Sequence, residues 1–447
     1  MTSAAMSRPA EPLHEPIPLE AIQSGAARHF TVSVAAKAGT QLLRLGTMLV
    51  LARLLVPADF GVLAMVMSAL GIAELLRDLG LSQATVRAAE VTHGQVNTLF
   101  WINATLGVLL AGLCVLAAPW LGALLADPRV GGVAAAMGAT FLLNGLASQH
   151  MALLRRRLRF AAIARVNIAA ALGGSIVALA LAALGAAYWA LVAAALTTSA
   201  INAIGVWISS GWRPSRPSYD PSVRPMMSFG GYLIVFGFLT YLGHNAHIAL
   251  IGRMFGASAA GLYLRASMLI TQPLSYALDP LRLIMPASLA RLQSQAEALR
   301  AHYLGTLAQL LLAAAPLGLW LALTADDVVH LLFGARWQGT GSVLSLLALS
   351  LVPQVLNSTT GWLYLASGNA RDLARWGAIG WSVVIAAMLL GLRWGINGVA
   401  AMYSLSMFLI LVPCLHYARR GTSVMLGDIW SRAWRPCAGA LLAALPL

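Results

Sequence analysis

Basic side chains inside long apolar segments are the residues of this sequence that could do chemistry. Lys37 and Arg44 lie seven residues apart in the segment 30–54, so on a helix of about 3.6 residues per turn they share one face. Charged groups inside apolar surroundings are costly and usually face a water-filled cavity or a partner. The pair therefore predicts a cavity face that binds an anion. For Lys37, an ammonium group that reaches back to the helix end is the alternative.

A second group of polar side chains lies in the segments 227–251 and 259–288. Three of them recur at intervals of seven residues, which is typical of a helix face that lines water. The group comprises His244, His247, Arg265, Gln272, Asp279 and Arg282. Two alternatives stay open. The histidines can be neutral, hydrogen-bonded interior groups, and Asp279 with Arg282 can form a local ion pair at i, i+3.

Two further charged clusters favour structural roles. Glu74, Arg77 and Asp78 have helical spacings of three and four, at which these side chains can neutralise one another. A basic run lies at a helix end, where attraction to anionic lipid of about 1 kcal/mol per basic residue accounts for it. Its members are Arg155, Arg156, Arg157 and Arg159.

The three cysteines, Cys114, Cys414 and Cys437, are scattered and show neither metal-ligand nor disulfide spacing. We therefore expect no metal site and no cofactor.

The composition indicates that lipid is the solvent of the apolar segments. Of 447 residues, 59% are hydrophobic and 10% are charged, whereas a soluble domain carries about 25% charged residues. Apolar stretches of about 20 residues, enough to cross a hydrocarbon core of about 30 Å, recur along the chain. The sequence predicts an all-α integral membrane protein. The net charge of +14 is nearly all arginine in short loops, which indicates membrane topology rather than nucleic-acid binding.

Twelve spans are predicted, and a thirteenth begins near the end of the sequence. They lie at 30–54, 60–86, 98–125, 131–153, 163–184, 187–209, 227–251, 259–288, 303–325, 340–367, 373–392 and 396–417. We expect residues 1–27 to be a disordered cytoplasmic tail and 28–210 to be a lobe of six spans. The polar, proline-rich loop 211–227 separates this lobe from a second one at 228–418. Residues 419–447 would be a cytoplasmic segment with a partial span, so we suspect that the C-terminus is incomplete.

The distribution of arginine predicts the orientation. With the N-terminus in the cytoplasm, the loops on the cytoplasmic side hold most of the arginines, including the run at 155–159. The opposite loops and their edges hold Arg53, Arg129, Arg253, Arg336 and Arg393. Cytoplasmic loops of membrane proteins carry such an excess of basic residues. We therefore expect a cytoplasmic N-terminus.

The two predicted lobes resemble each other weakly. LARLLVPADFGVL at 51–63 aligns with IGRMFGASAAGLY at 251–263, which pairs Gly61 with Gly261. LGAAYWALVAA at 184–194 aligns with WGINGVAAMYS at 394–404. With six spans in each half, the repeat is parallel. Many transporters are built from such repeats, with a substrate site between the halves.

The motifs themselves resemble a known family. LARLLVPADFGVLAMVMSALGIAELLRDLGLSQATVR (51–87), ALLRRRLRF (152–160) and YWALVA (188–193) are similar to bacterial polysaccharide exporters. The similarity continues through SFGGYLIVFGFLTYLGHNAHIALIGRMFGASAAGLYLRA (228–266), PASLARLQ (286–293) and NSTTGWLYLASGNARDLARWG (357–377). The chain thus resembles, over roughly 30–405, the Wzx-type flippases of the multidrug/oligosaccharidyl-lipid/polysaccharide superfamily.

This resemblance implies a function without covalent chemistry, so we do not expect an enzyme. It implies a transporter in the bacterial inner membrane that moves an undecaprenyl-diphosphate-linked oligosaccharide. The implied partners are membrane lipids, a polysaccharide polymerase and a co-polymerase. Family members usually have fourteen helices. The cationic candidates would then bind the diphosphate, and the arginines at 155–159 could collect it on the cytoplasmic side. Related sequences usually carry a carboxylate where this chain has His247. The resemblance therefore does not imply that an ion is bound and co-transported at this position.

Two other functions compete with this interpretation. A drug or small-cation antiporter of the same superfamily would favour carboxylates over arginines in the cavity. A membrane glycan polymerase or ligase would need a sizeable outer loop or a paired acid and base. The outer connections at 123–131 and 326–339 are short, and Asp326 with Asp327 is the one adjacent carboxylate pair within them.

Overall fold

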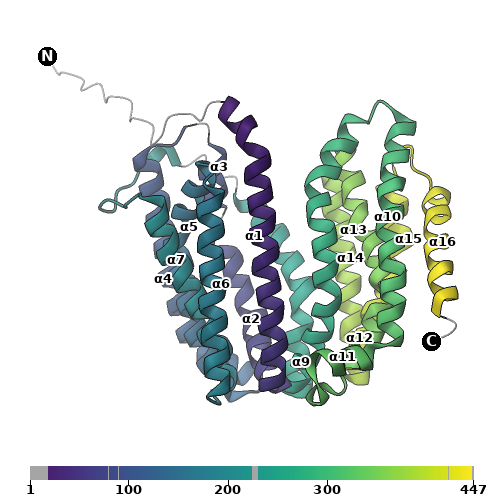
Figure 1. Ribbon diagram of the computed structural model, residues 1–447, viewed down its shortest axis with the longest axis horizontal. Coiled ribbons are helices and arrows are strands. Elements are labelled where there is room, and N and C mark those ends of the chain that lie inside the picture. The colour runs from purple at the N-terminus through teal and green to yellow at the C-terminus, as the bar shows by residue number, and fades with distance from the viewer. Residues whose placement is uncertain (1–18, 79, 89, 224–229, 421, 445–447) are drawn as a thin grey trace. The chain divides into compact units, whose positions relative to one another are not determined.

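The computed structural model describes residues 19–78, 80–88, 90–223, 230–420 and 422–444. Side chains are described from residue 35 onward, apart from 75, 230–240, 242–244, 283, 370 and 444. Over this part of the chain the structure is helical, so the predicted all-α fold is confirmed (Figure 1). The first group of helices is α1 (Leu19–Leu54), α2 (Pro57–Asp78), α3 (Leu81–Arg87), α4 (His93–Leu124), α5 (Pro128–Arg156), α6 (Phe160–Ala183) and α7 (Tyr188–Ser210).

The second group begins with a very long helical segment. Its members are α9 (Gly230–Arg291), α10 (Ala296–Leu323), α11 (Ala325–Phe333), α12 (Thr340–Ala348), α13 (Leu351–Ala366), α14 (Ala370–Gly391), α15 (Gly395–Ala418) and α16 (Leu426–Ala444). Short 3-10 turns lie at Pro221–Val223, Ala335–Trp337 and Leu392–Trp394. The segment α9 is broken at Gly256, whose φ of 86° lies outside the helical region, so it covers two of the predicted spans.

Among the described residues, seven helical segments are long and apolar enough to cross a membrane. An eighth is added if α12 and α13, which meet at a bend of 51°, form one broken span. Each of the twelve predicted spans overlaps a helix, but the number of crossings stays a prediction. The chain is a multi-pass membrane protein.

The chain divides into two compact units. Unit 1 comprises residues 1–55 and 66–238, and unit 2 comprises 56–65 and 239–447. The helix α2 therefore contributes its first residues to unit 2 and the rest to unit 1. The prediction of two lobes separated at 211–227 stays a prediction.

Unit 1 is built around α5, which packs against α3, α4 and α7, while α1 packs against α6. Small residues let these helices approach closely, as is usual where helices meet in a membrane. A Cβ added at Gly145 of α5 would lie 2.6 Å from the backbone oxygen of Asn103 in α4. The linker that follows α7 is held on α4. There the buried side chains of Asn97 and Thr98 form hydrogen bonds of 2.9–3.0 Å with the backbone of residues 215–220.

Unit 2 contains a very close contact between the start of α2 and the second half of α9. A Cβ added at Gly61 would lie 1.6 Å from the backbone oxygen of Ala257, and one at Gly261 would lie 2.0 Å from that of Pro57. The two glycines that the sequence repeat pairs are thus neighbours in space. At the C-terminal end, α16 packs on α10 and is joined to it by the ion pair between Arg300 and Asp428.

Candidate functional site

A polar cavity of about 350 Å³ lies within unit 1, between the end of α2, α3, α5 and α7. Its position inside a bundle of apolar helices makes it the candidate functional site, because ligand sites are concave and carry a few convergent polar groups. The polar residues that line it are Arg77, Asp78, Ser82, Gln83, Asn144, Ser148, Arg155, Thr198, Ser199 and Asn202.

The carboxylate of Asp78 accepts hydrogen bonds at the junction of α2 and α3. Its Oδ1 accepts a hydrogen bond from the Ser82 hydroxyl at 2.6 Å and lies 3.4 Å from the Ser82 backbone nitrogen. The buried amide of Asn103 donates to the same oxygen at 3.3 Å. Gly80 has a φ of 75°, a left-handed conformation that glycine adopts without strain. Asp78 is therefore the last residue of α2, and Gly80 directly precedes α3.

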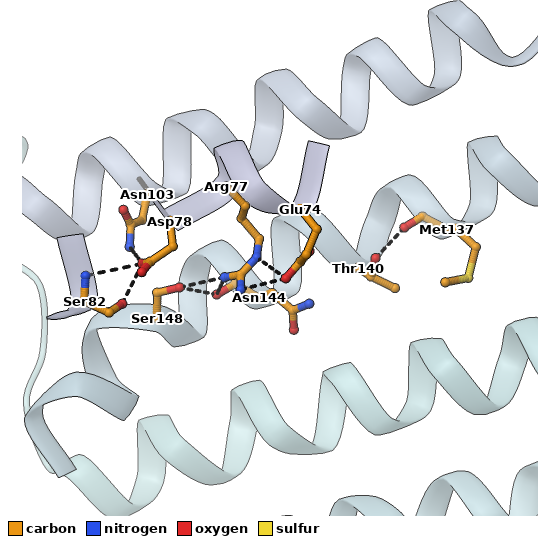
Figure 2. Close-up of polar contacts among 9 residues, drawn as sticks. All are labelled: Glu74, Arg77, Asp78, Ser82, Asn103, Met137, Thr140, Asn144 and Ser148. Carbon is orange, nitrogen blue, oxygen red and sulfur yellow. Dashed lines mark hydrogen bonds and ion pairs between the residues drawn. The ribbon is translucent and has the colours of Figure 1, made fainter. Parts of the chain in front are cut away.

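The guanidinium of Arg77 is held by three partners (Figure 2). Its Nε lies 2.8 Å from Oε1 of Glu74, which confirms an ion pair within this predicted cluster. Its Nη1 donates to the Ser148 hydroxyl at 2.8 Å and lies 3.4 Å from the backbone oxygen of Asn144. Arg77 is therefore neutralised, and it links α2 to α5.

Three arginines of the 155–159 run bind backbone carbonyls. Arg156 donates to the oxygens of Thr85 and Ala88 at the end of α3. Helix C-termini have free carbonyls and a partial negative charge, so basic groups stabilise them. Arg157 and Arg159 do the same at the end of α7: their Nη1 atoms lie 2.7 Å from Ser210 O and 3.1 Å from Ser209 O, respectively. Burial lowers the pKa of Arg157, and the nearby charge of Arg159 lowers it further.

Arg155 differs from its neighbours in the run. Its exposed side chain lines the cavity and forms no hydrogen bond or ion pair with any residue that the structure describes. Because Arg77 is paired with Glu74, Arg155 is the cation on the cavity lining that has no ion-pair partner among the described residues. The four arginines predicted to act together thus separate into three helix caps and one cavity residue.

The other cationic candidates in unit 1 lie on α1. The side chains of Lys37 and Arg44 are both exposed there. Their predicted role as cavity residues stays a prediction.

The remaining candidates belong to unit 2, and those whose side chains are described have different partners. His247 lines a smaller cavity of about 60 Å³ with Tyr263, Gln354 and Tyr403, while the side chain of His244 lies outside the described residues. Arg265 is 7% exposed, and its guanidinium carbon lies 3.9 Å from the centre of the Phe60 ring.

Two local pairs account for the rest of the predicted stripe on α9. The Tyr276 hydroxyl donates to Gln272 at 2.7 Å. Asp279 and Arg282 form the i, i+3 ion pair at 3.5 Å, and both side chains are largely exposed. Asp279 and Arg282 therefore form the local ion pair that was the alternative to a cavity-lining role.

The neutral polar side chains that line the unit 1 cavity were not predicted, because the sequence prediction of this site considered ionisable groups. Asn144 and Ser148 on α5, and Thr198 and Asn202 on α7, are spaced by four residues. Such i, i+4 pairs lie on one helix face. The spacing of four residues between polar side chains, within two otherwise apolar segments, could have indicated this polar helix face.

Comparison with known proteins identifies the family. The model of the family "Polysaccharide biosynthesis protein" matches residues 50–342, more than half of the chain. The chain is 26% identical over 353 residues to the lipopolysaccharide biosynthesis protein WzxC of Escherichia coli (strain K12), covering 77% of this chain and 70% of that protein. It is also 26% identical over 307 residues to the teichuronic acid biosynthesis protein TuaB of Bacillus subtilis (strain 168), covering 68% of this chain and 63% of that one.

A solved structure has the same fold. The lipid II flippase MurJ superposes with a TM-score of 0.74 and 12% identity, covering 93% of each chain. The resemblance to polysaccharide exporters found in the motifs is thereby confirmed. This multi-pass helical protein belongs to the polysaccharide biosynthesis protein family.

Proposed function

We propose that this protein flips an undecaprenyl-diphosphate-linked oligosaccharide across the bacterial inner membrane for the synthesis of a surface polysaccharide. The observation that carries the proposal is the guanidinium of Arg155, which lines a polar cavity of an apolar helical bundle and has no partner among the described residues. The names of the relatives support it, since they refer to lipopolysaccharide and teichuronic acid biosynthesis and to a lipid II flippase.

The guanidinium of Arg155, which has no partner among the described residues, favours an anionic ligand. Glu74 neutralises Arg77, and Asp78 is engaged in the turn between α2 and α3. Arg155 remains available, and its planar guanidinium matches the oxygens of a phosphate in a bidentate manner.

The translocation needs no covalent step. The diphosphate would be held at Arg155 while the glycan crosses a hydrated space and the lipid tail stays in the bilayer. Alternating access of two halves is the mechanism common to transporters built from repeats. We expect a cytoplasmic N-terminus from the arginine distribution, and we expect the flipped units to pass to a polysaccharide polymerase and its co-polymerase.

A deletion strain tests the proposal in cells. Without this protein, lipid-linked repeat units should accumulate on the inner leaflet, and surface polysaccharide should be lost. Expression of the wild-type chain should remove the accumulation and restore surface polysaccharide. Periplasmic accessibility of the labelled glycan measures the delivery of repeat units. Normal delivery of repeat units to the periplasm in the deletion strain, with no other flippase expressed, would refute the proposal.

A further inference from the structure

The volume of the unit 1 cavity limits what it can bind. At about 350 Å³ it lies at the lower end of the range of about 300–1,000 Å³ that is usual for ligand pockets. The cavity is partly open, so a repeat unit of several sugars can lie only partly inside it. The cavity can hold a single sugar ring together with an adjoining phosphate.

Part of the hydrogen-bonding capacity of this cavity is already used. Arg77 is bound by Glu74 and Ser148, and the Ser148 hydroxyl donates to the backbone oxygen of Asn144 at 3.0 Å. The hydroxyl of Thr198 donates to the backbone oxygen of Ala194 at 2.7 Å. These groups hold the walls of the cavity in place.

The remaining capacity belongs to neutral groups, to Arg155 and to the Asp78 oxygen that does not bind Ser82 or Asn103. The side-chain amides of Asn144 and Gln83 and the hydroxyl of Ser199 form no hydrogen bond with any described residue. In Figure 2 the Asn144 amide points away from Arg77, and no dashed line reaches it. Two carboxamides and one hydroxyl can both donate and accept. Beside them, Arg155 offers donors alone.

A sugar ring matches this inventory. Its hydroxyl groups both donate and accept, whereas a lipid tail would leave the amides of the cavity without partners at a cost in free energy. We propose that this cavity binds the sugar that is joined to the diphosphate, with Asn144 as a specificity-determining contact and Arg155 at the adjoining phosphate. This inference rests on the proposed function, because the ligand is the lipid-linked sugar.

Binding to purified protein in detergent tests the inference. The probes are undecaprenyl diphosphate and its forms that carry one glucose, one galactose or one N-acetylglucosamine. We expect at least one glycosylated form to bind the wild type about tenfold more tightly than the bare diphosphate, a gain equal to about 1.4 kcal/mol.

Asn144→Ala should abolish this gain and leave the affinity for bare undecaprenyl diphosphate within about twofold of wild type, as expected when a single hydrogen-bonding side chain is lost. Unchanged binding of the bare lipid also shows that the variant is folded. Ser199→Ala, which removes a single hydroxyl, is a second variant in case Asn144→Ala is unstable, and it should reduce the same gain. Arg155→Ala should weaken the binding of every probe alike.

The outcomes separate the two proposals. If the wild type binds bare and glycosylated lipids equally, or if Asn144→Ala and Ser199→Ala both keep the full gain, the sugar site is wrong and the flippase proposal stands. If the wild type binds none of the probes, the proposed function itself fails.

Discussion

Replacing Arg155 with alanine is expected to reduce export of lipid-linked repeat units to about 1–10% of the wild-type rate. The guanidinium lines the unit 1 cavity and has no partner among the described residues, so a bound phosphate would be its main contact. Hydrogen bonds to charged groups contribute about 1.5–3 kcal/mol, which corresponds to a loss of about ten- to hundredfold. Periplasmic appearance of labelled glycan in the complemented deletion strain measures the effect.

Two matched variants make this test specific. Arg155→Lys keeps the charge but loses the bidentate geometry, so it should restore export in part. Arg165→Ala removes an exposed arginine of the neighbouring α6 that binds no described residue, and it should export normally. Wild-type export by Arg155→Ala at an equal protein level would remove Arg155 from the site.

Replacing Gly61 with alanine is expected to destabilise unit 2 severely. The added Cβ would lie 1.6 Å from a backbone oxygen of α9, so the two helices must separate. Overpacking of this kind costs about 3 kcal/mol or more. For a unit of about 200 residues this loss lowers the melting temperature by on the order of 10 °C. Thermal unfolding of the detergent-purified protein, followed by size-exclusion chromatography, measures the shift.

The control for this variant is Gly361→Ala in α13 of the same unit. No atom lies within 4 Å of the Cβ that would be added there. Alanine favours a helix over glycine by up to about 1 kcal/mol, so this variant should be as stable as wild type or slightly more stable. Equal melting temperatures for Gly61→Ala and wild type would contradict the close contact between α2 and α9.

The helices were predictable because a hydrocarbon core requires about 20 consecutive apolar residues, and that pattern is visible along the sequence. The break between α2 and α3 was not predicted, since 60–86 reads as one apolar segment. It depends on Asp78, which binds Ser82 and Asn103, and on the left-handed Gly80. Such a turn is set by side-chain contacts as well as by hydropathy.

Whether a polar contact could be predicted from the sequence depends on how far apart its two residues lie along the chain. The ion pairs Glu74–Arg77 and Asp279–Arg282 follow from helical spacing and could be predicted. The partners of Arg156 and Arg157 could not, because the carbonyls of Ala88 and Ser210 lie more than fifty residues away. The unit 1 cavity is likewise lined by four helices, and only the tertiary structure brings Asn144 of α5 and Thr198 of α7 to the same cavity.

Reconstitution of the purified protein is the most direct test of the flippase proposal. Liposomes would contain undecaprenyl diphosphate with one fluorescent glycan, and a membrane-impermeant reagent would quench the label in the outer leaflet. We expect the protected inner-leaflet fraction to become accessible in proteoliposomes with the wild-type chain, and much more slowly with Arg155→Ala. Protection equal to that of protein-free liposomes, with folded wild-type protein present, would contradict the account.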